Sequence, residues 1–172
     1  DALVNLGNSL LKRDRPAEAL DSYRRAHQLQ PGNALILSNM GSLLEGQGRL
    51  AEAIDCCQRA IELDGNMAGA YCNLGAAVKR LGRPEESLRY FEQAIEREPS
   101  LAQAHWNRSL SLLSCGRLEE GWREYEWGWK SGGRKPVRPF PQPRWEGEPL
   151  EGKTILVHDE QGVGDEILFA GM

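Results

Sequence analysis

The sequence predicts an all-α fold: a right-handed superhelical solenoid of four helical hairpins, followed by a linker and an incomplete α/β start. Three observations predict the solenoid. The sequence matches itself without a gap when it is shifted by 34 residues, small residues recur at that spacing, and turn signals divide each unit into two helices. The expected repeats cover about residues 1–33, 34–67, 68–101 and 102–130.

Small residues define three columns of the repeat. They are Gly7, Gly41, Gly75 and Ser109; Ala19, Ala53, Ser87 and Gly121; and Ala26, Ala60, Ala94 and Gly128. Glycine inside a helix costs about 1 kcal/mol relative to alanine, so its recurrence indicates that two helices approach each other closely. A further column holds mostly large residues, which we expect to fill the gaps: Tyr23, Cys57, Phe91 and Tyr125.

Turn signals stand at one position of every repeat. They are Asp14-Arg15, Gly48-Arg49, Gly82-Arg83 and Gly116-Arg117. Pro16 and Pro84 follow at positions where the first turn of a helix tolerates proline, and Pro31 and Pro99 end a second helix. Each repeat is therefore expected to be helix, turn, helix, and the second helix of the fourth repeat is expected over Leu118 to Lys130.

The period, the small columns, the aromatic column and the closing prolines resemble the tetratricopeptide repeat over residues 1–130. Gly65 departs from that pattern by replacing a proline, and the position early in the first helix, often tyrosine or tryptophan in the family, varies. That position holds Leu3, Leu37, Tyr71 and His105. The resemblance implies a superhelix whose first helices line a concave groove that binds protein partners.

One polar column lies on the first helices, and all its members are asparagine: Asn5, Asn39, Asn73 and Asn107. Asparagine has poor helix propensity, so its recurrence indicates that the amide is used. A ladder of amides can pair with the N–H and C=O groups of an extended peptide whatever its sequence. The alternative is that each asparagine bonds to the neighbouring repeat and braces the stack.

Other residues are candidates for the same groove. Lys12, Lys79 and Arg80 lie toward the helix ends and would make the channel mildly basic, although a solvated rim is the simpler interpretation. Trp106 precedes Asn107 and fits either the floor of the groove or a cap. Trp122, Trp127 and Trp129 are expected to cap the last repeat.

The asparagine ladder resembles the repeats of O-linked N-acetylglucosamine transferase and its bacterial relatives. That resemblance implies that the ladder holds an acceptor polypeptide. Repeats that clamp a chaperone carboxyl terminus carry a basic residue where this chain has Asn73, so that mode of binding is disfavoured.

Residues 131–152 are rich in proline, glycine and basic side chains and are expected to be a linker. Residues 153–172 read as strand, glycine turn and helix, but Ile167 replaces the third glycine of a dinucleotide motif and argues against NAD. The stretch from Trp145 to Asp165 resembles the start of a heptosyltransferase-like glycosyltransferase domain in bacterial repeat proteins. The resemblance implies a base role for Asp165 in a longer parent, and this chain is expected to catalyse nothing.

Composition excludes several other functions. A formal charge of −4 gives no reason to expect nucleic acid or an acidic membrane as partner. The four cysteines show neither a CxxC pair nor metal-ligand spacing, so we expect reduced thiols and no metal or cofactor. Unpaired cysteines and the lack of a targeting signal favour the cytoplasm. The expected partner is a polypeptide, and the open ends of the solenoid would also allow two copies to stack.

Overall fold

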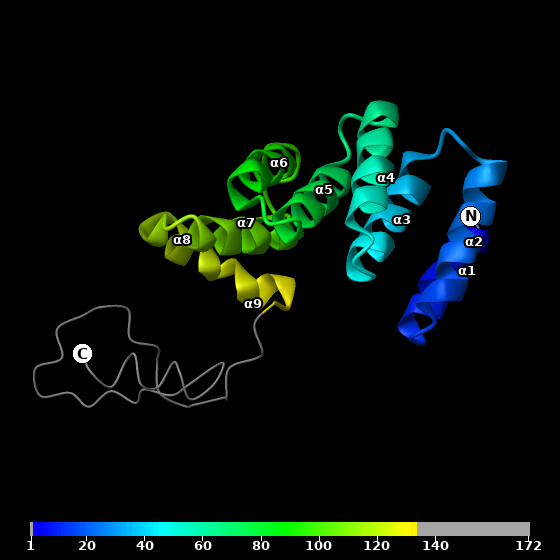
Figure 1. The fold of residues 1–172 in the computed structure, drawn as a ribbon, viewed down its shortest axis with the longest axis horizontal. Coiled ribbons are helices and arrows are strands. Elements are labelled where there is room, and N and C mark those ends of the chain that lie inside the picture. Colours follow the sequence, from blue (N-terminus) through cyan, green and yellow to red (C-terminus); the bar gives the residue numbers. More distant parts are fainter. Residues whose placement is uncertain (1, 134–172) are drawn as a thin grey trace, which may run out of the picture.

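The computed structural model describes residues 2–133, and every regular element in that range is an α-helix (Figure 1). The helices are α1 (Ala2–Lys12), α2 (Pro16–Leu29), α3 (Ala34–Gly46), α4 (Leu50–Leu63), α5 (Ala68–Arg80), α6 (Pro84–Arg97), α7 (Ala102–Ser114), α8 (Leu118–Tyr125) and α9 (Trp127–Ser131). The predicted all-α class is confirmed. Most of the predicted linker, and the predicted strand, turn and helix at 153–172, lie outside the described residues.

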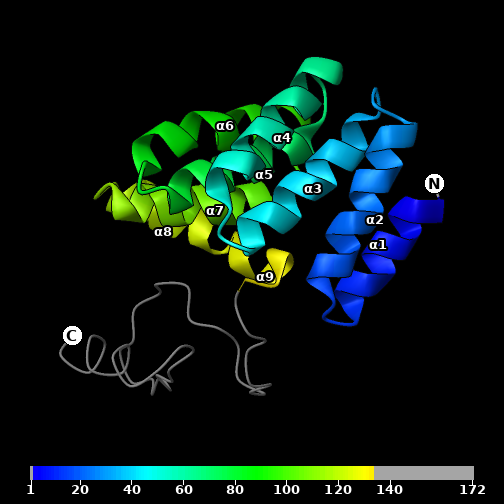
Figure 2. The same cartoon turned by 45° about the vertical axis from the view of Figure 1, so that its right-hand side comes forward.

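The helices form successive hairpins that stack along the chain (Figures 1 and 2). Within each hairpin the two helices pack together, and the second helix then packs against the first helix of the next hairpin. The first helices α3, α5 and α7 also pack against one another in that order. Helix α1 differs from the other first helices, because it packs on α2, and Figure 2 shows α2 between α1 and α3.

The glycine column marks close helix crossings, as predicted. A Cβ atom at Gly75 would lie 2.6 Å from Cε1 of Phe91, and one at Gly7 would lie 2.5 Å from Cε1 of Tyr23. The rings of Phe91 and Tyr23 are 0% and 1% exposed. Large side chains of the second helices therefore fill the space that the glycines of the first helices leave open.

Each hairpin turn contains one residue in the left-handed region: Asp14, Gly48, Gly82 and Gly116, with φ between 56° and 82°. The next residue donates its backbone N–H to a carbonyl five residues earlier, for example Arg49 to Leu44 at 2.9 Å. This is the C-terminal cap that glycine favours, and aspartate is among the few other residues that adopt it. The predicted turns are confirmed.

A second repeated feature was not predicted from the sequence. The arginine of each turn pairs with a glutamate three residues later, at the start of the second helix: Arg15 with Glu18, Arg49 with Glu52, Arg83 with Glu86, and Arg117 with Glu120. The hydrogen bond from Arg49 lowers the pKa of Glu52. A negative charge in the first turn also matches the helix dipole, and the 34-residue spacing of both members could have revealed the pair.

The fourth hairpin departs from the prediction in one respect. The segment expected as one helix over Leu118 to Lys130 is divided into α8 and α9, which meet at Glu126. Aromatic packing on α7 flanks the break: Tyr125 lies against Trp106, with ring centroids 4.8 Å apart, and Trp127 stacks on His105 at 4.1 Å. The chain does not continue as one helix here, and large aromatic side chains pack against α7 on both sides of the break.

Candidate peptide-binding face

Three of the four ladder asparagines lie on adjacent first helices. Asn39, Asn73 and Asn107 belong to α3, α5 and α7, and each is partly buried. Asn5 is exposed on α1, which packs on α2 rather than on α3. The structure therefore brings together the last three members of the predicted ladder and leaves Asn5 apart from them.

Asn73 combines the two roles that the sequence left open. Its Nδ2 donates to the backbone oxygen and to Oγ of Ser38, both at 3.2 Å, and so ties α5 to α3. Its Oδ1 has no hydrogen-bond partner among the described residues. Bracing thus uses the donor half of the amide and leaves an acceptor that a ligand N–H could reach.

Asn39 and Asn107 differ in how far their amides are already used. The side-chain amide of Asn39 makes no hydrogen bond to any of residues 2–133. Asn107 accepts a hydrogen bond through Oδ1 from Nζ of Lys79 at 3.1 Å, and its Nδ2 lies 4.0 Å from Sγ of Cys72. The number of hydrogen bonds that the side-chain amide makes to the described residues therefore rises along the face, from none at Asn39 to two at Asn107.

The three predicted basic residues do not gather in one place. Arg80 donates to the backbone oxygen of Glu45 and forms an ion pair with its carboxylate at 3.0 Å. Lys79 lies beside it and reaches toward α7, whereas Lys12 is exposed at the end of α1. Only Lys79 and Arg80 accompany the asparagines of α3, α5 and α7.

Trp106 is buried beneath the end of the fourth hairpin. Its side chain is 9% exposed and packs against Tyr125, and the backbone at Gly133 approaches the indole so closely that a Cβ there would overlap it. The sequence left two roles open for Trp106, the floor of the groove or part of a cap. The structure favours the cap, because little of the ring is exposed to a ligand.

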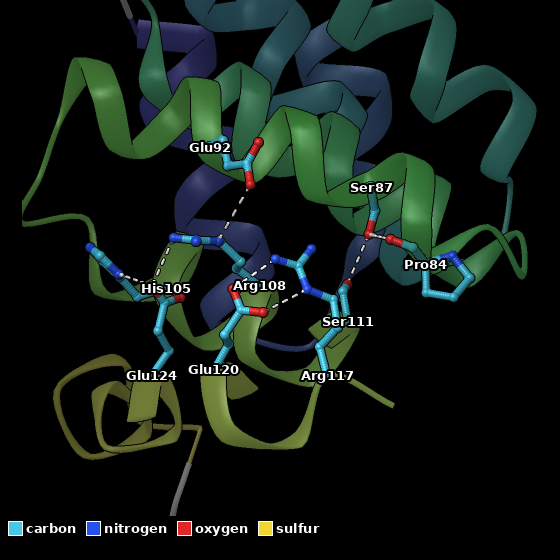
Figure 3. Close-up of polar contacts among 9 residues, drawn as sticks. All are labelled: Pro84, Ser87, Glu92, His105, Arg108, Ser111, Arg117, Glu120 and Glu124. Atoms are coloured by element: carbon cyan, nitrogen blue, oxygen red, sulfur yellow. Dashed lines mark hydrogen bonds and ion pairs between the residues drawn. The ribbon is translucent and has the colours of Figure 1, made fainter. Parts of the chain in front are cut away.

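A charged network that the sequence analysis did not identify lies next to this cap (Figure 3). Arg108 donates to Glu124 at 2.7 Å, and Nδ1 of His105 lies 3.6 Å from the same carboxylate oxygen. Arg108 occupies the column of Leu6, Met40 and Leu74. A charge in an otherwise apolar column was the signal that could have revealed the network.

Three of the four cysteines, Cys56, Cys57 and Cys72, are buried in the packed helices. Burial raises the pKa of Cys57 to about 12 and that of Cys72 to about 11, and it also raises the pKa of Cys56. Among residues 2–133 no group of three potential ligands could hold a metal ion. All four cysteines are free thiols in this structure.

These thiols predict a simple labelling result. Cys115 is the one cysteine that is not buried, so a disulfide reagent at neutral pH is expected to modify it first. The three buried cysteines should react only after guanidinium has unfolded the protein, which thiol titration with and without denaturant measures. Rapid reaction of Cys57 in the folded protein would contradict this assignment.

Two surface recesses lie away from the asparagines. One, of about 570 Å³, is bordered by the loops around Asn33 and Asp64, and the other, of about 330 Å³, lies between Leu20 of α2 and Cys56 of α4. Neither contains Asn39, Asn73 or Asn107. Neither recess therefore coincides with the face that carries these asparagines.

Comparison with known proteins identifies the repeats. Tetratricopeptide repeat family models match residues 1–33 and 32–100, which together are more than half of the chain. The chain therefore belongs to the tetratricopeptide repeat family. A stretch of 33 residues is also similar to part of a curated protein, FlbA of Caulobacter vibrioides, at 48% identity; the match spans 19% of this chain and 6% of FlbA.

Several solved structures share the fold. MamA is 24% identical with a TM-score of 0.64, covering 76% of this chain and 77% of MamA. The first repeat domain of Spaghetti (RPAP3), bound to the HSP90 peptide SRMEEVD, is 26% identical with a TM-score of 0.63, covering 67% and 91%. The second repeat domain of human RPAP3, in complex with the HSP70 peptide SGPTIEEVD, is 29% identical with a TM-score of 0.58, covering 62% and 89%.

Within residues 2–133, none of the helices is both long enough and apolar enough to cross a membrane.

Proposed function

We propose that this chain is a protein-interaction module that holds an extended peptide along α3, α5 and α7. The observation that carries the proposal is the unused hydrogen-bonding capacity of Asn39 and of Oδ1 of Asn73, on neighbouring helices of one face. Amides that are already oriented by packing can pair with a peptide backbone at little entropic cost. The two RPAP3 domains support the proposal, because each was determined with a bound peptide.

In a longer protein the module would recruit acceptor polypeptides to a glycosyltransferase-like domain. The resemblance of the stretch from Trp145 to Asp165 to the start of such a domain supports this context, while the module itself is non-catalytic. The test is to incubate a chain extended through the downstream domain with nucleotide sugars and a peptide that binds the module. Sugar transfer detected by mass spectrometry, and its loss in Asp165→Asn, would support the context; no transfer from any donor would refute it.

The binding test uses an extended-peptide library and the double variant Asn39→Ala/Asn73→Ala. We expect the unaltered chain to retain library members and the double variant to lose at least about tenfold in affinity, because two backbone hydrogen bonds are removed. Asn66→Ala is the matched control, since Asn66 is exposed in the loop before α5. Helical content measured by circular dichroism must be the same in all three proteins. Equal binding by the double variant would show that the asparagines only brace the stack.

Self-association is a second candidate function, favoured by the two ends of the stack. Leu6 is 47% exposed, whereas its column partners Met40 and Leu74 are 8% and 2% exposed. At the other end Trp122 is 57% exposed, whereas Leu88, one repeat earlier, is 7% exposed. Each end thus presents an apolar position that a neighbouring repeat covers inside the chain.

Sedimentation at increasing protein concentration tests self-association. If the ends stack on each other, the mass should rise with concentration, and Leu6→Gln/Trp122→Gln should remain monomeric. A monomer at all concentrations would remove this candidate, and it would leave the peptide-binding proposal untouched.

A further inference from the structure

Lys79 is the least compensated charge on the proposed peptide-binding face. It lies in the last turn of α5 and is only partly exposed. The one hydrogen bond of its side chain to a described residue is the donation from Nζ to Oδ1 of Asn107, at 3.1 Å. No carboxylate oxygen of the described residues lies within 4.0 Å of Nζ. By contrast, the neighbouring Arg80 is paired with Glu45.

Burial has a measurable consequence for this ammonium group. Loss of water around the side chain lowers the pKa of Lys79, and the positive charge of Arg80 lowers it further. Glu45 and Cys72 act in the opposite direction, but Glu45 is engaged by Arg80. A partly buried ammonium group with only a neutral amide as partner is stabilised by any anion that can reach it.

The position of Nζ relates this charge to the ladder. Lys79 donates a hydrogen bond to the amide oxygen of Asn107. Asn107 is the member of the asparagine column one repeat after Asn73. First helices pack about 8–10 Å apart and an extended chain advances about 3.3 Å per residue, so neighbouring ladder positions are about three peptide residues apart. A peptide held by Asn73 would therefore bring a side chain near Lys79 within a few residues.

We propose that Lys79 is an anion subsite of this face, which selects extended segments that carry a carboxylate about three residues from the part held by Asn73. The carboxylate takes Nζ away from Asn107 and frees Oδ1 of Asn107 to accept a peptide N–H. Acidic segments thus gain an ion pair and complete the ladder, whereas neutral segments leave Asn107 occupied. This inference rests on the proposed peptide-binding function.

The test compares two peptide libraries on the full chain, both acetylated and amidated so that no terminal carboxylate is present. One library contains aspartate and glutamate, and in the other these are replaced by asparagine and glutamine. We expect the acidic library to bind about tenfold more tightly, as one charge-assisted hydrogen bond allows. We expect Lys79→Met to abolish this difference. Because Asn107 Oδ1 is then free, the neutral library should bind this variant at least as tightly as it binds the unaltered chain.

Two further variants keep the result interpretable. Lys79→Gln retains a side chain that can donate to Asn107 and should also remove the acidic preference, so a fold defect specific to methionine cannot account for the loss. Lys12→Met, at an exposed lysine on α1, should retain the preference. The free carboxyl terminus is tested separately: restoring it to the neutral library and recovering tight binding would assign the subsite to a terminal carboxylate and overturn the side-chain assignment.

Failure of this inference can be told apart from failure of the proposed function. If the neutral and acidic libraries bind equally to the unaltered chain, peptide binding stands and the subsite does not. If the acidic preference survives in Lys79→Met, another residue is responsible and the inference is wrong. If neither library binds, the proposed function fails and the anion subsite fails with it.

Discussion

Replacing Phe91 by alanine is expected to lower the free energy of unfolding by about 3–5 kcal/mol. The ring is 0% exposed, and it fills the space that Gly75 leaves on the partner helix α5. It also belongs to a buried cluster that includes Tyr71 on α5 and Ala104 on α7, so it joins the third hairpin to the fourth. Because each repeat is stabilised by its neighbours, the cavity should weaken both hairpins.

Urea denaturation followed by circular dichroism measures this effect. Trp122→Ala is the control, because it removes an even larger ring that is 57% exposed on α8. We expect that control to cost about 1 kcal/mol or less, since exposed side chains contribute little to stability. A Phe91→Ala protein as stable as Trp122→Ala would mean that the glycine and aromatic columns do not interlock as described.

Arg108→Met is expected to lower the free energy of unfolding by about 2–3 kcal/mol, somewhat less than the cost of breaking a fully buried ion pair. The side chains of Arg108 and Glu124 are 21% and 18% exposed, and their bond length is 2.7 Å. Methionine fits the site, because Met40 occupies the same column of the repeat. The expected loss therefore comes from leaving the carboxylate of Glu124 mostly buried without its arginine partner.

A second substitution should restore the stability. Glu124 shares its column with Tyr90, so Arg108→Met/Glu124→Tyr gives the fourth repeat a pair similar to Leu74 and Tyr90 of the third. Replacing a buried ion pair by apolar residues is often neutral or stabilising. Arg123→Met, which breaks an ion pair whose members are 71% and 88% exposed, should cost about 0.5 kcal/mol or less. No recovery in the double variant would show that Arg108 contributes mainly through packing.

The candidate site was only partly predictable. The asparagine column was visible because it repeats every 34 residues, and repetition places one member on each first helix. The contact between Lys79 and Asn107 joins positions 28 residues apart, and that between Arg108 and Glu124 joins positions 16 apart. The two members of each pair belong to different columns. A column can show that a residue is unusual, as it does for Arg108, but it does not show which residue it contacts.

The sequence alone determined the helical hairpins, their boundaries and their close crossings, because glycine, proline and the turn residues act locally and recur in each repeat. Only the tertiary structure decided which amides are free, which charges are paired and where the last helix breaks. Those properties depend on how one repeat is placed against the next. A hydrogen bond is made or lost when two atoms move by a few tenths of an ångström, and a residue pattern does not specify positions that finely.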